Sequence, residues 1–590
     1  MMNTHNQGTQ GSVALAGRTV QTVSIRNTGA VPLEKVPELS LEEFRALVIE
    51  APRRGRRVSA LFGVREQHSS ASDTVRLIVV LAADAESRLH LASTRLESLC
   101  YPAMTPECPQ VHLFEREIAE RHGVRPEGHP WLKPVRFLHE PTGKRATNVQ
   151  DSVGNSVGFA VSHDAAGRSV DVETSANARA DRDVVGANRG VETAANAGAR
   201  GAVSSDCDVF GRDGLHPKTV GLMDFYRVEG DEVHEVAVGP VHAGVIEPGH
   251  FRFNCHGEQV FHLEISLGYQ HRGVERALVG GPNKRTLHYM ETLAGDTSIG
   301  HGTAYCQLVE ELSGTRPSAK ASAIRAIALE LERLANHVGD LGALAGDVGF
   351  QPTAAYCGRL RGDLLNLTAA ICGSRFGRTV VCPGGVRHDI DKALAEQLNV
   401  KLRAAMKDIQ NAAELLWEAA TVQARFEATG TITPKLAEEL GLVGVAARAS
   451  GLERDIRHDH PTGLYRLAQI PLSILPSGDV FARGHIRWLE IQRSALFIQE
   501  QLDSLPGGVL AKPVKKLESS RIAVSLVEGW RGEICHVAIT DAEGLFSTYK
   551  VYDASFHNWQ GLAMALRNQQ ISDFPMCNKS FNLSYCGHDL

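Results

Sequence analysis

The chain reads SAKASAIRAIALELERLANHVGDLGALAGDVG over residues 318–349, and apolar side chains recur there at spacings of three and four. That spacing is the period of one face of an α-helix. The recurring residues are Ile324, Ile327, Ala328, Leu331, Leu334, Ala335, Val338 and Leu341, and the other side carries Arg325, Glu332, Asn336 and Asp340. We therefore expect one long helix here, with neighbouring segments packed on its apolar face.

The helical period returns further along the chain. Residues 391–421 are rich in Ala, Leu and Lys and predict a second long helix. Runs at 236–241 and 259–267 predict two strands around the turn-forming Glu247-Pro248-Gly249. Another strand region begins near Ile522, and residues 553–566 (DASFHNWQGLAMAL) turn helical again. A mainly helical domain with β-hairpins at its edge is therefore expected over 219–590.

The N-terminal part has a different pattern. Residues 41–49 (LEEFRALVI) have helical spacing and residues 75–82 (VRLIVVLA) fit a buried strand, so 35–138 predicts a small α/β domain. We expect residues 1–34 to form a disordered tail. Residues 165–205 hold no aromatic side chain and cannot bury enough apolar area to offset their ordering entropy, so 139–218 predicts a flexible linker or insertion. The fold class expected for the chain is α+β.

Length and composition limit the classes of function that the chain can have. A chain of 590 residues is too long for one core. A net charge of −6, with 22% charged residues, gives no electrostatic reason to bind nucleic acid or an anionic membrane surface. No apolar run approaches 18 residues, and the start, MMNTHNQGTQGSVALAG, lacks the features of a secretory signal. Eleven scattered cysteines favour a reducing compartment, so we expect a cytoplasmic protein.

Six segments of the second block resemble, in the same order, motifs of one family. This family comprises the large subunits of nickel–iron hydrogenases and the 49-kDa subunit of respiratory complex I. The segments are VGPVH (238–242) with EPGHF (247–251), GYQHRGVE (268–275), LELERLANH (329–337), DIRHDHP (455–461), GDVFAR (478–483) and EGWRGE (528–533). The resemblance implies a fold like that of the nickel–iron hydrogenase large subunit over 219–590.

The N-terminal block resembles a second subunit of complex I. Residues 112–137, HLFEREIAERHGVRPEGHPWLKPVRF, are similar to the W-x-E-R-E-x-x-D-x-F-G-I-x-x-x-G-H-P-x-L-R signature of its 30-kDa subunit, with Arg121 and His122 replacing the usual Asp and Phe. A 30-kDa module ahead of a 49-kDa module is the order found in hydrogenase-3 and hydrogenase-4 large subunits and in some bacterial complex I subunits. Two segments near the C-terminus, SFHNW (555–559) and FNLSY (581–585), resemble the hydrogenase-4 type more than complex I.

Hydrogenases of this family bind nickel through two cysteine pairs, one in a stretch close to E-R-I-C-G-I-C-G-F-A-H and one in a C-terminal D-P-C-x-x-C. Here residues 291–305 read ETLAGDTSIGHGTAY, which puts Ala294 and Thr297 at the first two cysteine positions. Near the C-terminus, Asp573 is followed by Phe-Pro-Met-Cys, without a pair. Soft metals need thiolate ligands. We therefore expect this chain to hold no metal, and a nickel–iron centre to be missing.

The complex I subunit implies a quinone site instead. That site uses a histidine of the first β-turn and a tyrosine at the first cysteine pair. His242 or His250 could supply the histidine, whereas the tyrosine position falls on Gly295. Tyr289 and Tyr305 lie nearby but out of register.

Two further residues match the quinone cavity of the family, His337 and Asp347. A buried Asp–His pair can relay protons, because burial tunes both pKa values. His337 could equally form a hydrogen bond within a helical core. Both interpretations stay open at this point.

The remaining candidate residues surround the altered metal position. Asp296 is either a proton acceptor or, with Thr297, a cap of the following helix. His301 is expected to line the same cavity. Arg272, Glu275 and Arg387 are expected to line the former active-site cavity, where they could contact a cofactor.

The resemblance implies a large subunit of a membrane-associated, complex-I-like oxidoreductase. Its expected partners are a small iron–sulfur subunit, which would supply electrons for quinone or another acceptor, and membrane subunits of the proton-channel type. These partners would hold it on the cytoplasmic face of the inner membrane. The chain has no Gly-rich fingerprint for NADH, so any nucleotide would bind elsewhere in the complex. The alternatives are a redox-silent scaffold subunit and an active hydrogenase, which the missing thiolates disfavour.

Overall fold

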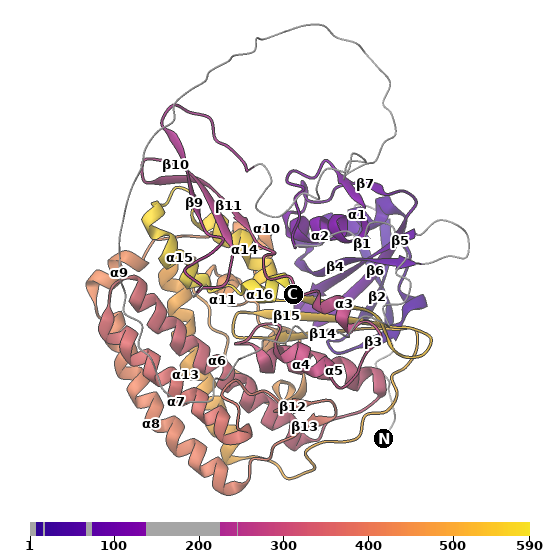
Figure 1. Ribbon diagram of the computed structural model, residues 1–590. Coiled ribbons are helices and arrows are strands. Elements are labelled where there is room, and N and C mark those ends of the chain that lie inside the picture. Colours follow the sequence, from indigo (N-terminus) through magenta and orange to yellow (C-terminus); the bar gives the residue numbers. More distant parts are fainter. Residues whose placement is uncertain (1–7, 16–17, 67–73, 137–224, 245) are drawn as a thin grey trace, which may run out of the picture. The chain divides into compact units, whose positions relative to one another are not determined.

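The computed structural model describes residues 8–15, 18–66, 74–136, 225–244 and 246–590 (Figure 1). The linker expected over 139–218 lies outside these residues. The described residues form an α+β structure, as predicted, and the parts before and after the linker belong to one compact unit. No helix in the described ranges combines the length and the apolar character needed to cross a membrane.

The N-terminal block is built on a five-stranded antiparallel sheet with the strand order β1-β2-β6-β5-β4. Its strands are β1 (Thr9–Leu15), β2 (Arg18–Ile25), β4 (Arg56–Glu66), β5 (Thr74–Ala83) and β6 (Arg88–Leu96). Two helices, α1 (Leu41–Glu50) and α2 (His112–His122), contact this sheet. Ser40 and Glu43 begin α1 with a reciprocal capping box, which satisfies free N–H groups of the first turn.

The prediction of a disordered tail over 1–34 is wrong where the structure describes it. Residues of this segment form β1, β2 and β3 (Ala30–Pro32). The sequence RTVQTVSI of β2 is rich in β-branched residues, which favour strands. β3 pairs with β14 (Arg521–Glu528), so the N-terminal segment is held by a strand almost five hundred residues later in the chain.

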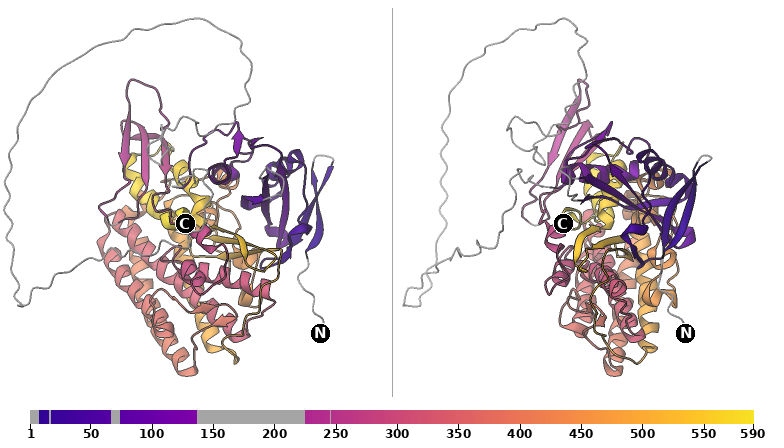
Figure 2. Two further views of the ribbon diagram at one scale, coloured as in Figure 1. Left: turned by 45° about the vertical axis from the view of Figure 1, so that its right-hand side comes forward. Right: turned by 90° about the vertical axis from the view of Figure 1, so that its right-hand side faces the viewer.

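The second block centres on α6 (Ala319–Asp347), which confirms the predicted long helix. It packs against α5 (Ser298–Ser313), α7 (Gln351–Cys372) and α13 (Val480–Asp503), and α7 also packs against α8 (Lys392–Trp417). Both views in Figure 2 show these long helices running alongside one another. The polar side of α6 is buried as well as its apolar side, so its polar residues need partners inside the protein.

Two further sheets complete the second block. One has the order β16-β15-β14-β3, with β15 (Glu533–Thr540) and β16 (Phe546–Tyr552). The other is the predicted hairpin region, in the order β11-β10-β9, with β9 (Val233–Val238), β10 (His250–His256) and β11 (Gln259–Ser266). Three helices follow β16: α14 (Ala554–Ala565), α15 (Phe574–Phe581) and α16 (Tyr585–Asp589).

The remaining elements are short. They are η1 (Leu33–Lys35), η2 (Pro52–Arg54), η3 (Asp84–Glu86), β7 (Cys100–Pro102), η4 (Pro109–Val111), β8 (Arg125–Glu127), α3 (Val274–Leu278), α4 (Thr286–Glu291), β12 (Val381–Cys382), β13 (Gly385–Val386), α9 (Ala420–Phe426), α10 (Pro434–Leu440), α11 (Gly444–Ala449), α12 (Ile456–Asp459), η5 (Gly463–Arg466) and η6 (Ile571–Asp573).

Buried ion pairs join the two blocks. Arg57 of β4 binds Asp84 at 2.9 Å and also pairs with Glu533 of β15. Lys550 of β16 pairs with Glu117 of α2 and lies 2.7 Å from Glu275 of α3. Breaking one partner of such a pair leaves an uncompensated buried charge, so these contacts fix the two blocks together.

Candidate functional site

The turn between α4 and α5 holds the first altered metal position. Ala294 and Thr297 are buried, at 0% and 2% exposure. Asp296 lies between them in the sequence and accepts two hydrogen bonds from the guanidinium of Arg531, at 2.7 and 2.8 Å. The Oγ1 of Thr297 accepts from Trp530 Nε1 and from Arg531 Nη1, at 3.1 and 3.2 Å. A fixed cation and a carboxylate therefore fill this turn.

The C-terminal segment that meets this turn is α16 with the residues just before it. Arg531 donates from Nε to the carbonyl of Asn582 at 2.6 Å. Arg272 joins the two segments directly, because one guanidinium nitrogen donates to the carbonyls of Leu293 and Cys586, at 2.9 and 3.0 Å. The structure thus brings α16, and not the Asp573 segment, to the first altered position.

The prediction that the second cysteine pair would fall near Asp573 and Cys577 is therefore wrong. Asp573 pairs with Arg425 at 3.0 Å, and Cys577 is buried in a separate apolar cluster. The spacing of two residues in the sequence could have pointed to the α16 segment. In NLSYCG, Ser584 and Gly587 stand three residues apart, at the two cysteine positions of D-P-C-x-x-C.

These residues do not fit a nickel–iron centre. Ala294 and Thr297 at the first two cysteine positions supply no thiolate, and neither do Ser584 and Gly587 in the segment that meets them. Burial raises the pKa of the nearby Cys586 thiol to about 12, and the carboxylates of Glu247 and Asp296 add to the rise. No cluster of three or more His, Cys, Asp and Glu side chains suited to a metal occurs among the described residues.

A chain of buried polar groups starts behind the turn. His301 of α5 contacts Asp553 Oδ2 through Nε2 at 3.3 Å and His536 Nε2 through Nδ1 at 3.0 Å. His536 of β15 contacts the Tyr549 hydroxyl of β16 through Nδ1 at 2.9 Å. All four side chains are at most 2% exposed. We refer to Asp553, His301, His536 and Tyr549 as the relay.

The relay ends beside α16 and Arg531. A Cβ placed on Gly587 would lie 3.0 Å from Asp553 Cγ, so α16 packs directly on this carboxylate. Burial tends to raise the pKa of Asp553, but the His301 hydrogen bond and the Arg531 charge outweigh it and hold the pKa well below its usual range. Burial lowers the pKa of His536, and the neighbouring His301 lowers it further. The relay therefore carries its negative charge at the Asp553 end.

A second buried carboxyl lies beside Asp296. Glu332 of α6 accepts hydrogen bonds from the N–H groups of Ile299 and Gly300 in the first turn of α5, at 2.7 and 3.1 Å. Burial raises its pKa to about 8, those two bonds oppose the rise, and Asp296 adds to it. The Asp296 pKa is lowered, because the charge and hydrogen bonds of Arg531 outweigh the effect of burial. The two carboxyls therefore hold different protonation states at neutral pH.

His337 and Asp347 do not form the expected pair. Asp347 is exposed at the end of α6, about 15 Å along the helix from His337. His337 is fully buried, and its Nε2 lies 2.7 Å from Glu490 Oε2. Glu490 also binds Arg448 at 2.7 Å, so His337 belongs to a buried charge network between α6, α11 and α13.

Three other expected residues are dispersed. Glu275 binds Lys550 and also pairs with Arg121 of α2, which joins the two blocks away from the predicted cavity. Arg387 is exposed beyond β13, and no hydrogen bond or ion pair of the described residues links it to Asp296. His242 lies in the turn between β9 and β10, where its Nε2 contacts the carbonyl of Gly249 at 2.9 Å. The turn that holds His242 also contacts α16, since Glu247 of the same turn approaches Cys586.

Comparisons with known proteins agree with this architecture. The family described as "Respiratory-chain NADH dehydrogenase, 49 Kd subunit" matches residues 347–522. A component of the F(420)H(2) dehydrogenase of Methanosarcina mazei is 30% identical over 322 residues, which cover 54% of this chain and 84% of that protein. NADH-quinone oxidoreductase subunit 4 of Thermus thermophilus is 28% identical over 369 residues, covering 58% and 90%.

A hydrogenase relative is similar to about the same extent. Formate hydrogenlyase subunit 5 of Escherichia coli is 29% identical over 366 residues, and this match covers 61% of the chain and 64% of that protein. The chain thus spans less than two thirds of this relative and most of the other two. Together these matches show that the chain belongs to the family of the 49-kDa subunit of the respiratory-chain NADH dehydrogenase, which also includes hydrogenase subunits.

Proposed function

We propose that the chain is the large subunit of a membrane-associated, complex-I-like oxidoreductase that passes electrons from an iron–sulfur partner subunit to quinone. In this proposal the chain holds no nickel–iron centre, and membrane subunits of the proton-channel type keep it on the cytoplasmic face of the membrane. The observation that carries the proposal is the Asp296–Arg531 pair, which fills the turn where the hydrogenase relatives are expected to bind metal.

The relay supports a role in proton supply. Reduction of a quinone to a quinol takes up two protons with two electrons. The contacts allow one donor direction throughout: Tyr549 donates to His536 Nδ1, His536 Nε2–H to His301 Nδ1, and His301 Nε2–H to Asp553. This tautomer assignment follows from the hydrogen-bond pattern. Asp553 is ionised in this arrangement, so a proton that leaves His301 Nε2 could then be replaced through the relay.

The turn between β9 and β10 supports an approach for an apolar acceptor. Val241 is 74% exposed and Ile246 is 55% exposed, and both flank His242. The Nε2–H of His242 donates to the Gly249 carbonyl, and Nδ1 makes no hydrogen bond to another described residue. In the doubly protonated ring, Nδ1–H would be the donor to a quinone carbonyl. Gly295 leaves the tyrosine half of the family site unfilled, and a Cβ added there would meet no atom within 4 Å.

The experiment is a quinone reductase assay on the isolated complex. His242→Gln should lower kcat/KM for quinone about tenfold, the value of one hydrogen bond to a carbonyl. His256→Gln changes an exposed histidine of β10 and should leave the rate unchanged. Equal rates for both variants would contradict a role of His242 in quinone binding.

One observation favours a second candidate, the redox-silent scaffold subunit. The cavity that Asp296 and Glu332 share with Phe376 has a volume of only about 10 Å³, the size of a single water. If the chain is a scaffold, substitutions in the relay and at His242 would leave electron transfer unchanged while substitutions that unfold the chain would prevent assembly. The same assay therefore separates the two candidates.

A further inference from the structure

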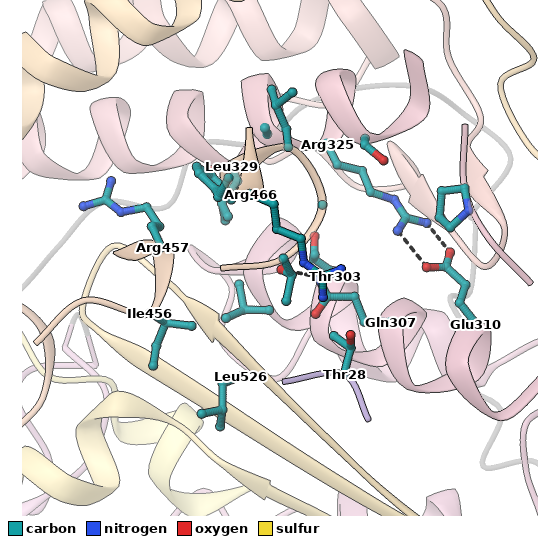
Figure 3. A pocket seen from close by; sticks show the side chains of 18 of the residues that line it. Thr28, Thr303, Gln307, Glu310, Arg325, Leu329, Ile456, Arg457, Arg466 and Leu526 are labelled. Carbon is teal, nitrogen blue, oxygen red and sulfur yellow. Dashed lines mark hydrogen bonds and ion pairs between the residues drawn. The ribbon is translucent and has the colours of Figure 1, made fainter. Parts of the chain in front are cut away.

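A cavity of about 230 Å³ lies away from the altered metal position (Figure 3). Segments that are distant in the sequence line it: Thr28 of the N-terminal block, α5, α6, the η5 region and β14. A cavity of about 150 Å³ is enough to hold benzene. This cavity is therefore large enough for a ring with one polar substituent.

A buried hydroxyl in this cavity has no partner. Thr303 of α5 is 6% exposed, and its Oγ1 makes no hydrogen bond with any described residue. Buried polar atoms are nearly always paired, and leaving one unpaired costs about 1–3 kcal/mol. Gln307, one helical turn further on, also lines the cavity and binds Thr462 and Ser525 at 2.9 and 2.7 Å. The Thr303 hydroxyl is thus a buried group in the cavity lining that could form a hydrogen bond with a ligand atom.

One arginine that lines the cavity, Arg466, has N–H groups without a hydrogen bond to a described residue. Arg466 reaches into the cavity from η5 (Figure 3), and its one hydrogen bond to a described residue runs from Nε to the Pro461 carbonyl at 3.1 Å. By contrast, Arg325 is neutralised by Glu310, with contacts of 2.5 and 3.0 Å. Burial lowers the pKa of Arg466, the positive charges of Arg26 and Arg316 lower it further, and the negative charge of Glu311 in the same lining opposes them. An anion beside Arg466 would relieve this repulsion between like charges.

The rest of the lining is partly apolar. Leu329 of α6, Leu464 of η5 and Leu526 of β14 all line the cavity. Leu329 and Leu526 are at most 4% exposed, so they present a dry surface to a ligand. Such walls favour a hydrocarbon body over a fully hydrated inorganic ion.

We propose that this cavity binds a small organic carboxylate. The carboxylate group would accept hydrogen bonds from Arg466 and from the Thr303 hydroxyl, and the hydrocarbon body would pack against Leu329, Leu464 and Leu526. Because the cavity is lined by both blocks, an occupant would stabilise the contact between them. The inference does not depend on the proposed quinone chemistry.

The test is calorimetric titration of the purified full-length chain with benzoate, benzyl alcohol and inorganic phosphate. Benzoate should bind at least about tenfold more tightly than either of the others, because a charge-assisted hydrogen bond is worth that factor or more. Arg466→Gln should weaken benzoate binding about tenfold. Thr303→Val keeps the side-chain shape, removes the hydroxyl and should weaken binding by a smaller factor. Arg276→Gln, an exposed change on α3, is the matched control and should leave binding unchanged.

Three results would overturn the proposal. They are the absence of benzoate binding at millimolar concentration, benzoate binding that is unchanged in both Arg466→Gln and Thr303→Val, and phosphate or benzyl alcohol binding as tightly as benzoate. If Arg466→Gln fails to fold, Thr303→Val decides alone. A failure here would leave the quinone reductase assay unaffected, so the two proposals can fail separately.

Discussion

Asp296 and Arg531 form an ion pair at the first altered cysteine position. The carboxylate is 31% exposed and the guanidinium 6%, so the arginine depends on this partner more than the aspartate does. The contact is bidentate, which is the strongest geometry for this pair of groups. Trp530 forms a cation–π contact with Arg531, whose guanidinium carbon lies 3.9 Å from the ring centroid.

Asp296→Asn should destabilise the chain. The substitution leaves the Arg531 charge buried without a full counter-charge, which we expect to lower the free energy of unfolding by about 2–3 kcal/mol after allowance for the exposure of Asp296. Urea denaturation measures this. Asp363→Asn removes one partner of an exposed pair with Arg359 and should leave the unfolding midpoint nearly unchanged. Equal effects of the two substitutions would show that the Asp296–Arg531 pair is not structural.

Glu332 predicts a pH dependence of stability. Its pKa is raised to about 8 in the folded chain, so the folded state binds a proton that the unfolded state releases above its ordinary pKa of 4.5. The free energy of unfolding should therefore fall as pH rises between about 5 and 8, by at most about 1.4 kcal/mol per pH unit. Glu332→Gln should remove this contribution, measured as a flatter profile of stability against pH. Parallel profiles for the two proteins would refute the raised pKa.

Sequence reasoning singled out several candidate residues but not their partners. Asp296, His301 and His337 stood out because they lie in or near family motifs. Their counter-groups follow 235, 252 and 153 residues later, and no local spacing connects such distant positions. His337 pairs with Glu490. It cannot pair with Asp347, because residues ten apart on one straight helix cannot meet.

At the scale of elements, the relay depends on three segments held in register. α5 supplies one histidine, and the antiparallel pairing of β15 with β16 supplies the other with its tyrosine. Cross-strand placement fixes the separation of such side chains. A change at Tyr549, the end of the relay far from Asp553, should therefore act on proton supply without moving the proposed quinone site.

Tyr549→Phe tests this directly. Loss of the hydroxyl leaves His536 Nδ1 without its donor, so we expect about 1–2 kcal/mol less stability. If the relay delivers protons, quinone-dependent turnover should also fall about tenfold or more with little change in KM. Tyr356→Phe alters an exposed tyrosine of α7 and serves as the control. Unchanged turnover in Tyr549→Phe would exclude the relay from catalysis.

The N-terminal strands make a structural prediction at the same scale. Asn27 is buried just before β3 and makes three hydrogen bonds of 2.8 Å, to both backbone groups of Leu526 and to the carbonyl of His460. Asn27→Ala should cost about 3 kcal/mol or more of unfolding free energy, because it leaves buried backbone groups unpaired. Asn283→Ala, in an exposed turn, should cost less than about 1 kcal/mol by the same denaturation assay. A small cost at Asn27 would mean that β3 contributes little to stability.

Elements with a clear period were the predictable ones. α6 and α8 follow from apolar spacing, since burial on a helix repeats every three to four residues. β3 was missed because it has only three residues and pairs with β14, which lies far along the chain. β1 and β2 pair with each other, and the β-branched residues of β2 were a signal that could have found them. The segment 582–589 was missed because Ser584 and Gly587 show the cysteine spacing without the cysteines.

At the scale of the whole molecule, the fold joins two distant segments at the altered cysteine positions. The helices around α6 and the sheet of β14 to β16 bring the turn at Asp296 and the α16 segment together, as a shared metal site would require. The sequence indicated the altered positions from the first cysteine pair alone. The structure adds that an ion pair and hydroxyl groups now occupy the site.

Metal analysis of the isolated complex decides whether the nickel–iron centre has been lost. Nickel and iron are measured per chain, together with the content of the co-purifying small subunit. We predict nickel far below one atom per chain and iron that rises and falls with the iron–sulfur partner. Nickel close to one atom per chain, retained after chelation, would contradict this loss and restore a hydrogenase.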